Sequence, residues 1–200
     1  MDHADHVRLL RNGVVARAVD ARQGSRPSDE IASSDVIGIW GDLGAGEGAF
    51  TLALADLLPA RSTIHAVDKD RGALAENERA YARFARGREV PALRTHPADF
   101  TTDLELPPLD GIVMANSLHF VKDKAPVLAR VRGLLKPGAR LLLVEYDTDD
   151  GNRWVPYPLS FETWRRVAVA NGFSEPRQLA IHPSRFLRGI YSALATPTER

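Results

Sequence analysis

Short apolar runs alternate with helical segments from residue 36 onward, and this alternation restricts the fold more than any other feature of the chain. Residues 112–114 and 141–144 are apolar without a break, which is typical of strands buried on both faces of a parallel sheet. Parallel strands need long crossover connections, and the segments between the runs are long enough to be helices. The predicted strands are residues 36–41, 63–67, 92–96, 111–115 and 140–145.

Three of the intervening segments have helical patterns. In residues 50–58 the apolar side chains share one helical face, and Pro59 ends the segment. Residues 127–135 have the same spacing and end at a Lys-Pro-Gly turn, residues 136–138, whereas residues 73–84 are helical by their alanine content. We therefore predict an α/β fold, a Rossmann-like doubly wound sheet with helices on both faces.

The last part of the chain departs from this alternation. Residues 161–171 are predicted to form a helix that ends at Gly172. Residues 177–181 and 185–195 are predicted to be two strands joined by a tight turn at residues 182–184. This antiparallel hairpin would complete a mostly parallel sheet of seven strands.

The balance of charge narrows the class of partner. The 200-residue chain carries 26 Lys plus Arg and 26 Asp plus Glu, whereas a protein that neutralises nucleic-acid phosphates normally has a basic excess. We therefore expect no nucleic-acid partner. The chain has no cysteine, which excludes disulfides, thiolate nucleophiles and Cys-type zinc sites, and no metal site is predicted. No apolar run approaches the ~18 residues that cross a bilayer, and the acidic N-terminus is unlike a secretory signal, so we expect a cytoplasmic protein without membrane contact.

A glycine-rich loop follows the first predicted strand and opens the first helix of the main pattern. It reads Asp42-Leu43-Gly44-Ala45-Gly46-Glu47-Gly48, and its glycines permit a tight turn and close contact between backbone and ligand. Asp68 ends the second predicted strand twenty residues after Gly48, the distance at which a carboxylate binds the hydroxyls of a ribose. The spacing therefore indicates a ligand with an adenosine-like sugar.

Two carboxylates decide between the ligands that fit this loop. Gly44, Gly46 and Ala49 also satisfy the relaxed dinucleotide motif, so an NAD-dependent oxidoreductase is one alternative. Asp42 and Glu47 flank the glycines, however, and two like charges ~4 Å apart repel by ~4 kcal/mol at an effective dielectric of about 20. A pyrophosphate would be repelled, whereas the ammonium and sulfonium groups of S-adenosylmethionine would be attracted.

These motifs resemble those of the class I S-adenosylmethionine-dependent methyltransferases, over residues 36–195. The glycine loop is similar to motif I of that family, Asp68 to its ribose-binding acid, and Asp99-Phe100 to the pair that brackets adenine. Residues 110–119 look like its fourth strand and following loop, residues 134–138 like its turn into strand five, and the closing hairpin like its reversed seventh strand. The resemblance implies S-adenosylmethionine as cofactor and the following binding residues: Asp42, Gly44, Ala45, Gly46, Gly48, Asp68, Lys69, Asp99, Phe100, Asn116 and Ser117.

Residues 1–35 do not share this resemblance. They combine a short amphipathic segment with a connector rich in Ser, Arg and Asp, at the place where the family carries variable lids. We therefore divide the chain into an N-terminal helical lid or connector, residues 1–35, and a domain for binding S-adenosylmethionine, residues 36–200.

The predicted function is methyl transfer to a small-molecule acceptor. Asn116-Ser117-Leu118-His119 replaces the Asn-Pro-Pro-Tyr-type loop of the enzymes that methylate amino groups in nucleic acids, which favours a small molecule, as in relatives from quinone biosynthesis. If the acceptor is a hydroxyl, His119 or Tyr157 could take its proton; an amine or a carbanion-like carbon needs no base. The apolar residues 154–159 either line an acceptor pocket or pack on the last helix. A non-catalytic module that binds S-adenosylmethionine is the other alternative.

Overall fold

The computed structural model describes residues 1–15, 37–184, 187 and 189–199. Its elements are α1 (His3–Val14), β1 (Ile39–Leu43), α2 (Ala49–Leu57), β2 (Thr63–Asp68), α3 (Arg71–Phe84), β3 (Ala92–Pro97), β4 (Leu109–Ala115), the 3-10 turn η1 (Leu118–Phe120), α4 (Ala125–Leu134), β5 (Leu135–Tyr146), α5 (Phe161–Ala170), β6 (Arg177–Pro183) and β7 (Gly189–Ala195).

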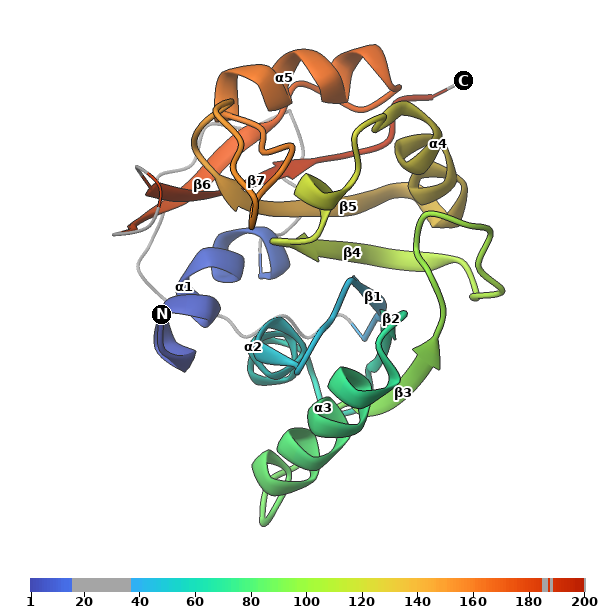
Figure 1. The fold of residues 1–200 in the computed structure, drawn as a ribbon. Helices are drawn as coiled ribbons and strands as arrows, with labels where there is room; N and C mark the ends of the chain where they lie inside the picture. Colours follow the sequence, from blue (N-terminus) through green and yellow to red (C-terminus); the bar gives the residue numbers. More distant parts are fainter. Residues whose placement is uncertain (16–36, 185–186, 188, 200) are drawn as a thin grey trace, which may run out of the picture.

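All seven of these strands belong to one sheet, in the order β3-β2-β1-β4-β5-β7-β6. Strands β1 to β5 are parallel, and β7 is antiparallel to both of its neighbours, β5 and β6. Helices α1, α2 and α3 cover one face, and α4 and α5 cover the other (Figure 1). The predicted Rossmann-like, mostly parallel sheet with a terminal antiparallel hairpin is confirmed, and its strand order reverses between β1 and β4.

The unbroken apolar run of β5 is explained by burial on both faces of the sheet. Leu141 and Leu143 belong to the core beneath α4 and α5, whereas Leu142 and Val144 belong to the core beneath α1 and α2. All four side chains are buried. Alternate residues of one strand therefore supply two separate cores, as the period of two in a strand requires.

Helix α1 contributes to the core on the α1–α2 face of the sheet. Leu9, Leu10 and Val14 are buried against α2 and the β5–β7–β6 side of the sheet, and the Arg140 guanidinium donates to the Val14 carbonyl oxygen at 2.6 Å. A side chain at Gly13 would begin 2.2 Å from Leu142 Cδ2, so a larger residue there would force Leu142 to move. The rest of the predicted connector lies outside the described residues, and the domain division at residue 35 stays a prediction.

Several predicted boundaries differ from those of the structure. Strand β1 extends to Leu43, and residue 36, where it was predicted to begin, is outside the described residues. The Lys-Pro-Gly segment at residues 136–138 is not a turn before the strand but lies within β5, because Leu135 already pairs with Leu109 before a register shift. Strand β6 includes His182 and Pro183, which pair with β7, so the turn comes later than predicted. Residues 185 and 186 of the predicted last strand are outside the described part, and β7 begins at Gly189.

Candidate functional site

The carboxyl ends of β1, β2, β4 and β5 meet at one edge of the sheet, on either side of the reversal in strand order. Open parallel sheets bind ligands at such a place, because the loops diverge there. The glycine loop follows β1, Asp68 ends β2, residues 116–119 follow β4, and Glu145 stands at the end of β5. These four groups make up the candidate site.

The glycine loop has one open position. Gly44, Gly46 and Gly48 all have positive φ (78°, 51° and 96°), a conformation that other residues rarely adopt. A side chain at Gly44 would begin 2.4 Å from Ser117 Cβ, and one at Gly48 would begin 2.4 Å from Asn77 Oδ1, but nothing lies within 4 Å of that position at Gly46. Gly44 and Gly48 are therefore needed for packing, and Gly46 is where a ligand can reach the backbone.

Asp68 joins this loop to the end of β2. Its Oδ2 accepts the Gly46 N–H at 2.8 Å, and its Oδ1 accepts the Asp70 N–H at 2.9 Å. Each carboxylate oxygen can accept a second hydrogen bond, so both stay available to hydroxyls. The carboxylate lies directly beside the open glycine, which fits a ribose placed over the loop.

The residues expected to bracket adenine lie beside the same loop. Lys69 Nζ is 3.9 Å from Asp99 Oδ2, and a side chain at Gly44 would come within 3.3 Å of the Phe100 ring. Asp99 Oδ1 accepts hydrogen bonds from the N–H and the hydroxyl of Thr101, which lower the pKa of Asp99. Asp99 is thus held as an anion at the end of β3.

The loop after β4 closes on the glycine loop. The Ser117 hydroxyl donates to the Leu43 carbonyl oxygen at 2.8 Å, and the Asn116 N–H donates to the Val144 carbonyl oxygen at 2.9 Å. Asn116 has a positive φ of 50°, and its buried Oδ1 has no hydrogen-bond partner among the described residues. A buried polar atom in that state is expected to have a ligand or water as its partner.

Asp42 is not the exposed anion that its place in the sequence suggests. It is buried and accepts the Thr51 hydroxyl at 2.6 Å, and Thr51 in turn accepts an N–H from Asn77 at 2.9 Å. Burial raises the pKa of Asp42 to about 7. Glu47 is exposed. The charge argument against a pyrophosphate is therefore weaker than expected, because at neutral pH Asp42 is ionised only in part.

A buried pair of side chains, His119 and Glu145, lies at the carboxyl ends of β4 and β5. His119 Nδ1 lies 2.9 and 3.0 Å from the two carboxylate oxygens of Glu145, and both residues are buried. A carboxylate accepts hydrogen bonds, so Nδ1 is the donating nitrogen, and in the neutral ring the lone pair is then on Nε2. Glu145 is also held by the Tyr146 N–H at 2.8 Å. The sequence predicted a role for His119 but not for Glu145. An acid at the end of an apolar parallel strand could have indicated that Glu145 belongs to the site.

Tyr157 is connected to His119 through its backbone. The Tyr157 N–H donates to the His119 carbonyl oxygen at 2.9 Å, and Lys124 Nζ donates to the Tyr157 carbonyl oxygen at 3.0 Å. In the apolar segment 154–159, Val155 and Leu159 are buried, whereas Trp154 and Tyr157 are exposed. Residues 154–159 are therefore anchored in the core through Val155 and Leu159, and they also expose two aromatic rings to solvent, where an acceptor could contact them.

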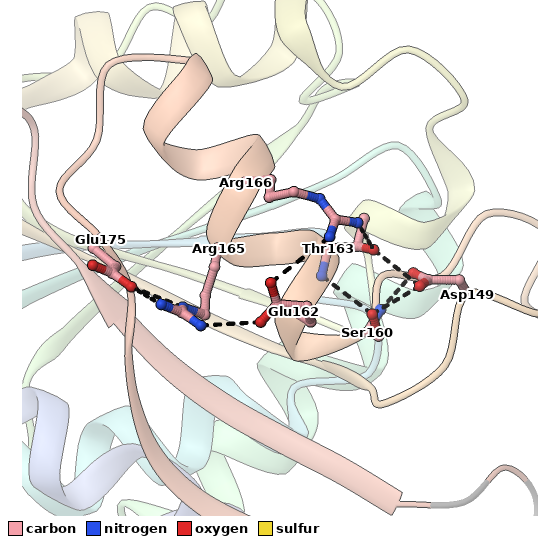
Figure 2. Close-up of polar contacts among 7 residues, drawn as sticks. All are labelled: Asp149, Ser160, Glu162, Thr163, Arg165, Arg166 and Glu175. Atoms are coloured by element: carbon pink, nitrogen blue, oxygen red, sulfur yellow. Dashed lines mark hydrogen bonds and ion pairs between the residues drawn. The ribbon is translucent and has the colours of Figure 1, made fainter.

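A polar cavity of about 540 Å³ lies beyond the end of β5. Asp147, Asp149 and Asp150 contribute to its wall. Figure 2 shows that Asp149 already has structural partners, since it accepts hydrogen bonds from the Ser160 N–H and hydroxyl and from the Thr163 hydroxyl at the start of α5. In Figure 2, Arg165 and Arg166 on the same helix are paired with Glu162, and Arg165 also with Glu175.

Comparison with known proteins identifies the family. A family model described as a methyltransferase domain matches residues 42–141, half of the chain, from the start of the glycine loop into β5. The chain belongs to this family. Together with the strand order, the match confirms the class I S-adenosylmethionine-dependent methyltransferase that the sequence motifs predicted.

Individual relatives cover different shares of the chain. An uncharacterized methyltransferase of Mycobacterium tuberculosis is 33% identical over 107 residues, which are 54% of this chain and 50% of that protein. The CurJ carbon methyltransferase has a TM-score of 0.66 at 22% identity, over 82% of this chain and 49% of its own. A 1,6-didemethyltoxoflavin-N1-methyltransferase of Burkholderia thailandensis has a TM-score of 0.63 at 18% identity, over 82% of this chain and 72% of its own. The chain thus spans about half the length of the curated relative.

In the described part of the chain, no helix is both long and apolar enough to cross a membrane.

Proposed function

We propose that this protein transfers a methyl group from S-adenosylmethionine to a small-molecule acceptor. The observation that carries the proposal is that the open glycine loop, Asp68 and the His119–Glu145 pair lie on one edge of the sheet, at the reversal in strand order. One half of this edge fits a nucleoside, and the other half holds a base.

The residues present fit the cofactor. Asp68 and the backbone at Gly46 would hold the ribose, Lys69, Asp99 and Phe100 would surround the adenine, and Asn116 would face the amino-acid part. Partial ionisation of Asp42 suits an ammonium group, because a nearby cation favours the carboxylate form. When bound, S-adenosylmethionine supplies a methyl group activated by a sulfonium leaving group.

The residues of the other half would prepare the acceptor. Nε2 of His119 takes the proton of an acceptor hydroxyl or acidic C–H, and the freed electron pair of the acceptor forms the bond to the methyl carbon. The methyl–sulfur bond breaks, and its electrons stay on sulfur. Glu145 holds the ring in the required tautomer and stabilises the imidazolium that forms. Holding both reactants in line contributes several kcal/mol more.

The class of acceptor is supported by the balanced charge of the chain and by its structural similarity to a carbon methyltransferase and a 1,6-didemethyltoxoflavin-N1-methyltransferase. Their reacting atoms differ, so the proposal leaves the reacting atom open. A cytoplasmic location, the lack of a nucleic-acid partner and the lack of membrane contact stay predictions. The hydroxyl of Tyr157 stays the second candidate base.

Two measurements test the proposal. Calorimetry should show binding of S-adenosylmethionine and S-adenosylhomocysteine but not of NAD, and Asp68→Ala should weaken that binding at least ~10-fold, about 1.4 kcal/mol. The matched control is Asp70→Ala, which removes the cap of α3 and should lower stability by ~1 kcal/mol at unchanged affinity. A screen with radiolabelled methyl donor over phenols, quinones, amines and thiols then tests transfer. Binding of NAD alone contradicts the proposal, and binding without any transfer favours a non-catalytic module.

A further inference from the structure

Three aromatic side chains on the segments that follow β4 and β5 are exposed, and we call them the aromatic rim. Phe120 is 61% exposed, Trp154 69% and Tyr157 41%. The other two tryptophans of the chain, Trp40 and Trp164, are buried. Isolated apolar side chains on a surface are ordinary, but three large exposed rings on the two segments that follow β4 and β5 indicate that something packs there.

The rim is attached to the proposed base. The rings of Phe120 and His119 are 4.3 Å apart between centroids, and the Tyr157 N–H donates to the carbonyl oxygen of His119. Lys124 donates to the carbonyl oxygens of both Val121 and Tyr157, which joins the segment after η1 to the rim. A molecule that packs on the rim therefore lies next to the imidazole.

The exposure of Trp154 is built into the local structure. Asn152 Oδ1 accepts the N–H groups of Trp154 and Val155 at 2.8 and 2.9 Å, and the Asn152 N–H donates to the Val155 carbonyl oxygen. Val155 is buried and anchors the turn, and a side chain at Gly151 would begin 2.2 Å from the Pro156 carbonyl oxygen. A surface fixed in this way loses little entropy when a ligand binds.

The charges around the rim favour a neutral occupant. Asp147, Asp149 and Asp150 lie on the segment that leads to Trp154, whereas Arg153 is the one cation on that segment, with its guanidinium 5.8 Å from the Trp154 ring. The Lys124 ammonium donates to backbone carbonyl oxygens and lies 6.0 Å from the centroid of the Tyr157 ring. The net negative charge of residues 147–154 disfavours carboxylated or phosphorylated acceptors.

We propose that Phe120, Trp154 and Tyr157 bind the aromatic ring of an uncharged aryl acceptor and so place its reactive group beside His119 Nε2. This inference rests on the proposed function, because it names the acceptor class of the same site. Offset or edge-to-face packing between rings adds to simple apolar burial. The rim therefore distinguishes an aryl compound from a saturated one of the same size.

The experiment uses two probes of similar shape, naphthol and its saturated counterpart decalol, with the full chain and S-adenosylhomocysteine present. Calorimetry should show that naphthol binds at least ~5-fold more tightly than decalol. Trp154→Ala and Phe120→Ala should each weaken naphthol binding ~10-fold, whereas Trp154→Phe should retain most of it. The matched control is Val169→Ala, since Val169 is an exposed apolar side chain on α5, and it should leave the affinity for naphthol unchanged.

Each result separates the rim from the methyl-transfer reaction. Affinity for S-adenosylhomocysteine that equals the wild-type value shows that a variant is folded. Equal affinity for both probes, no binding of naphthol, or unchanged binding in Trp154→Ala and Phe120→Ala overturns the inference about the rim. If naphthol binds at the rim but no aryl compound is methylated, the inference that the acceptor is an aryl compound is overturned, whereas methylation of an amine or thiol would still support the proposed function.

Discussion

At the scale of single residues, burial changes the chemistry of Asp42. Its carboxyl group is enclosed beneath the glycine loop, with Thr51 as its hydrogen-bond donor. The sequence shows an acid beside glycines, but not whether that acid faces water. Thr51 and Asn77 could not be connected to Asp42 from the sequence, because they reach it from two different helices, α2 and α3.

The first prediction concerns stability and pH. The native state raises the pKa of Asp42 from 3.8 to about 7, so it keeps a proton that the unfolded chain releases as pH rises between these values. Stability should therefore fall from about pH 4 to about pH 7, by about 4 kcal/mol from this group alone. Asp42→Asn, which keeps an acceptor oxygen for Thr51, should remove that loss. Urea unfolding at both ends of this range measures it, and a constant difference between variant and wild type at all pH values would contradict the assignment.

The second prediction concerns the tautomer of His119. Glu145→Gln has nearly the same shape, but its amide can donate to Nδ1 and so move the ring proton to Nε2. We expect kcat to fall ~100-fold or more, with unchanged affinity for S-adenosylhomocysteine. Glu105→Gln, in the exposed loop between β3 and β4, is the control and should be active. Wild-type turnover in Glu145→Gln would remove the pair from the reaction.

At the scale of elements, the alternation of apolar runs and helical segments predicted which strands exist better than it predicted where they end. The run 141–144 had to be a buried strand because both faces of β5 are covered. Neither the extension of β5 back to Leu135 nor that of β6 to Pro183 could be predicted. The first depends on pairing with Leu109 of β4, and the second on the register of the hairpin, in which Pro183 pairs with Gly189. Local sequence indicates turns, and long-range hydrogen bonds decide where strands begin.

The third prediction uses two helical glycines in opposite surroundings. Gly13→Ala in α1 should lower the free energy of unfolding by ~1–3 kcal/mol, since the new methyl group meets Leu142 at 2.2 Å. Gly133→Ala in α4 is the matched control. Nothing lies within 4 Å of its new methyl group, so the better helix propensity of alanine should raise stability by ~0.5–1 kcal/mol. Urea denaturation measures both, and equal effects would mean that α1 does not pack on the sheet as described.

At the scale of the whole molecule, the arrangement of motifs was predictable and the contents of the site only in part. Spacing alone brought Asp68, Asp99 and His119 to one sheet edge, because parallel strands end on the same side. Glu145 acquires its role only through contact with His119, 26 residues away. The exposure of Trp154 likewise follows from a turn fixed by Asn152 rather than from composition.

The fourth prediction concerns the stability of the whole chain with ligand. A ligand at 100 times its Kd stabilises the native state by about 2.7 kcal/mol, and for a chain of this size that raises Tm by roughly 5–10 °C. S-adenosylhomocysteine should produce such a rise and NAD should not. Thermal unfolding followed by circular dichroism measures the difference, and a rise with NAD alone would contradict the ligand assignment.

The position of β7 between β5 and β6 has a consequence for synthesis on the ribosome. Strand β6 leaves the exit tunnel before β7 but pairs only with it, so the hairpin joins the sheet as a unit after both have emerged. Until then β5 presents an unpaired edge, which is prone to aggregation, and Glu145 lacks its neighbour Tyr191. A nascent chain stalled before residue 189 would therefore carry the residues proposed to bind the nucleoside, whereas the strand beside the proposed base would be missing.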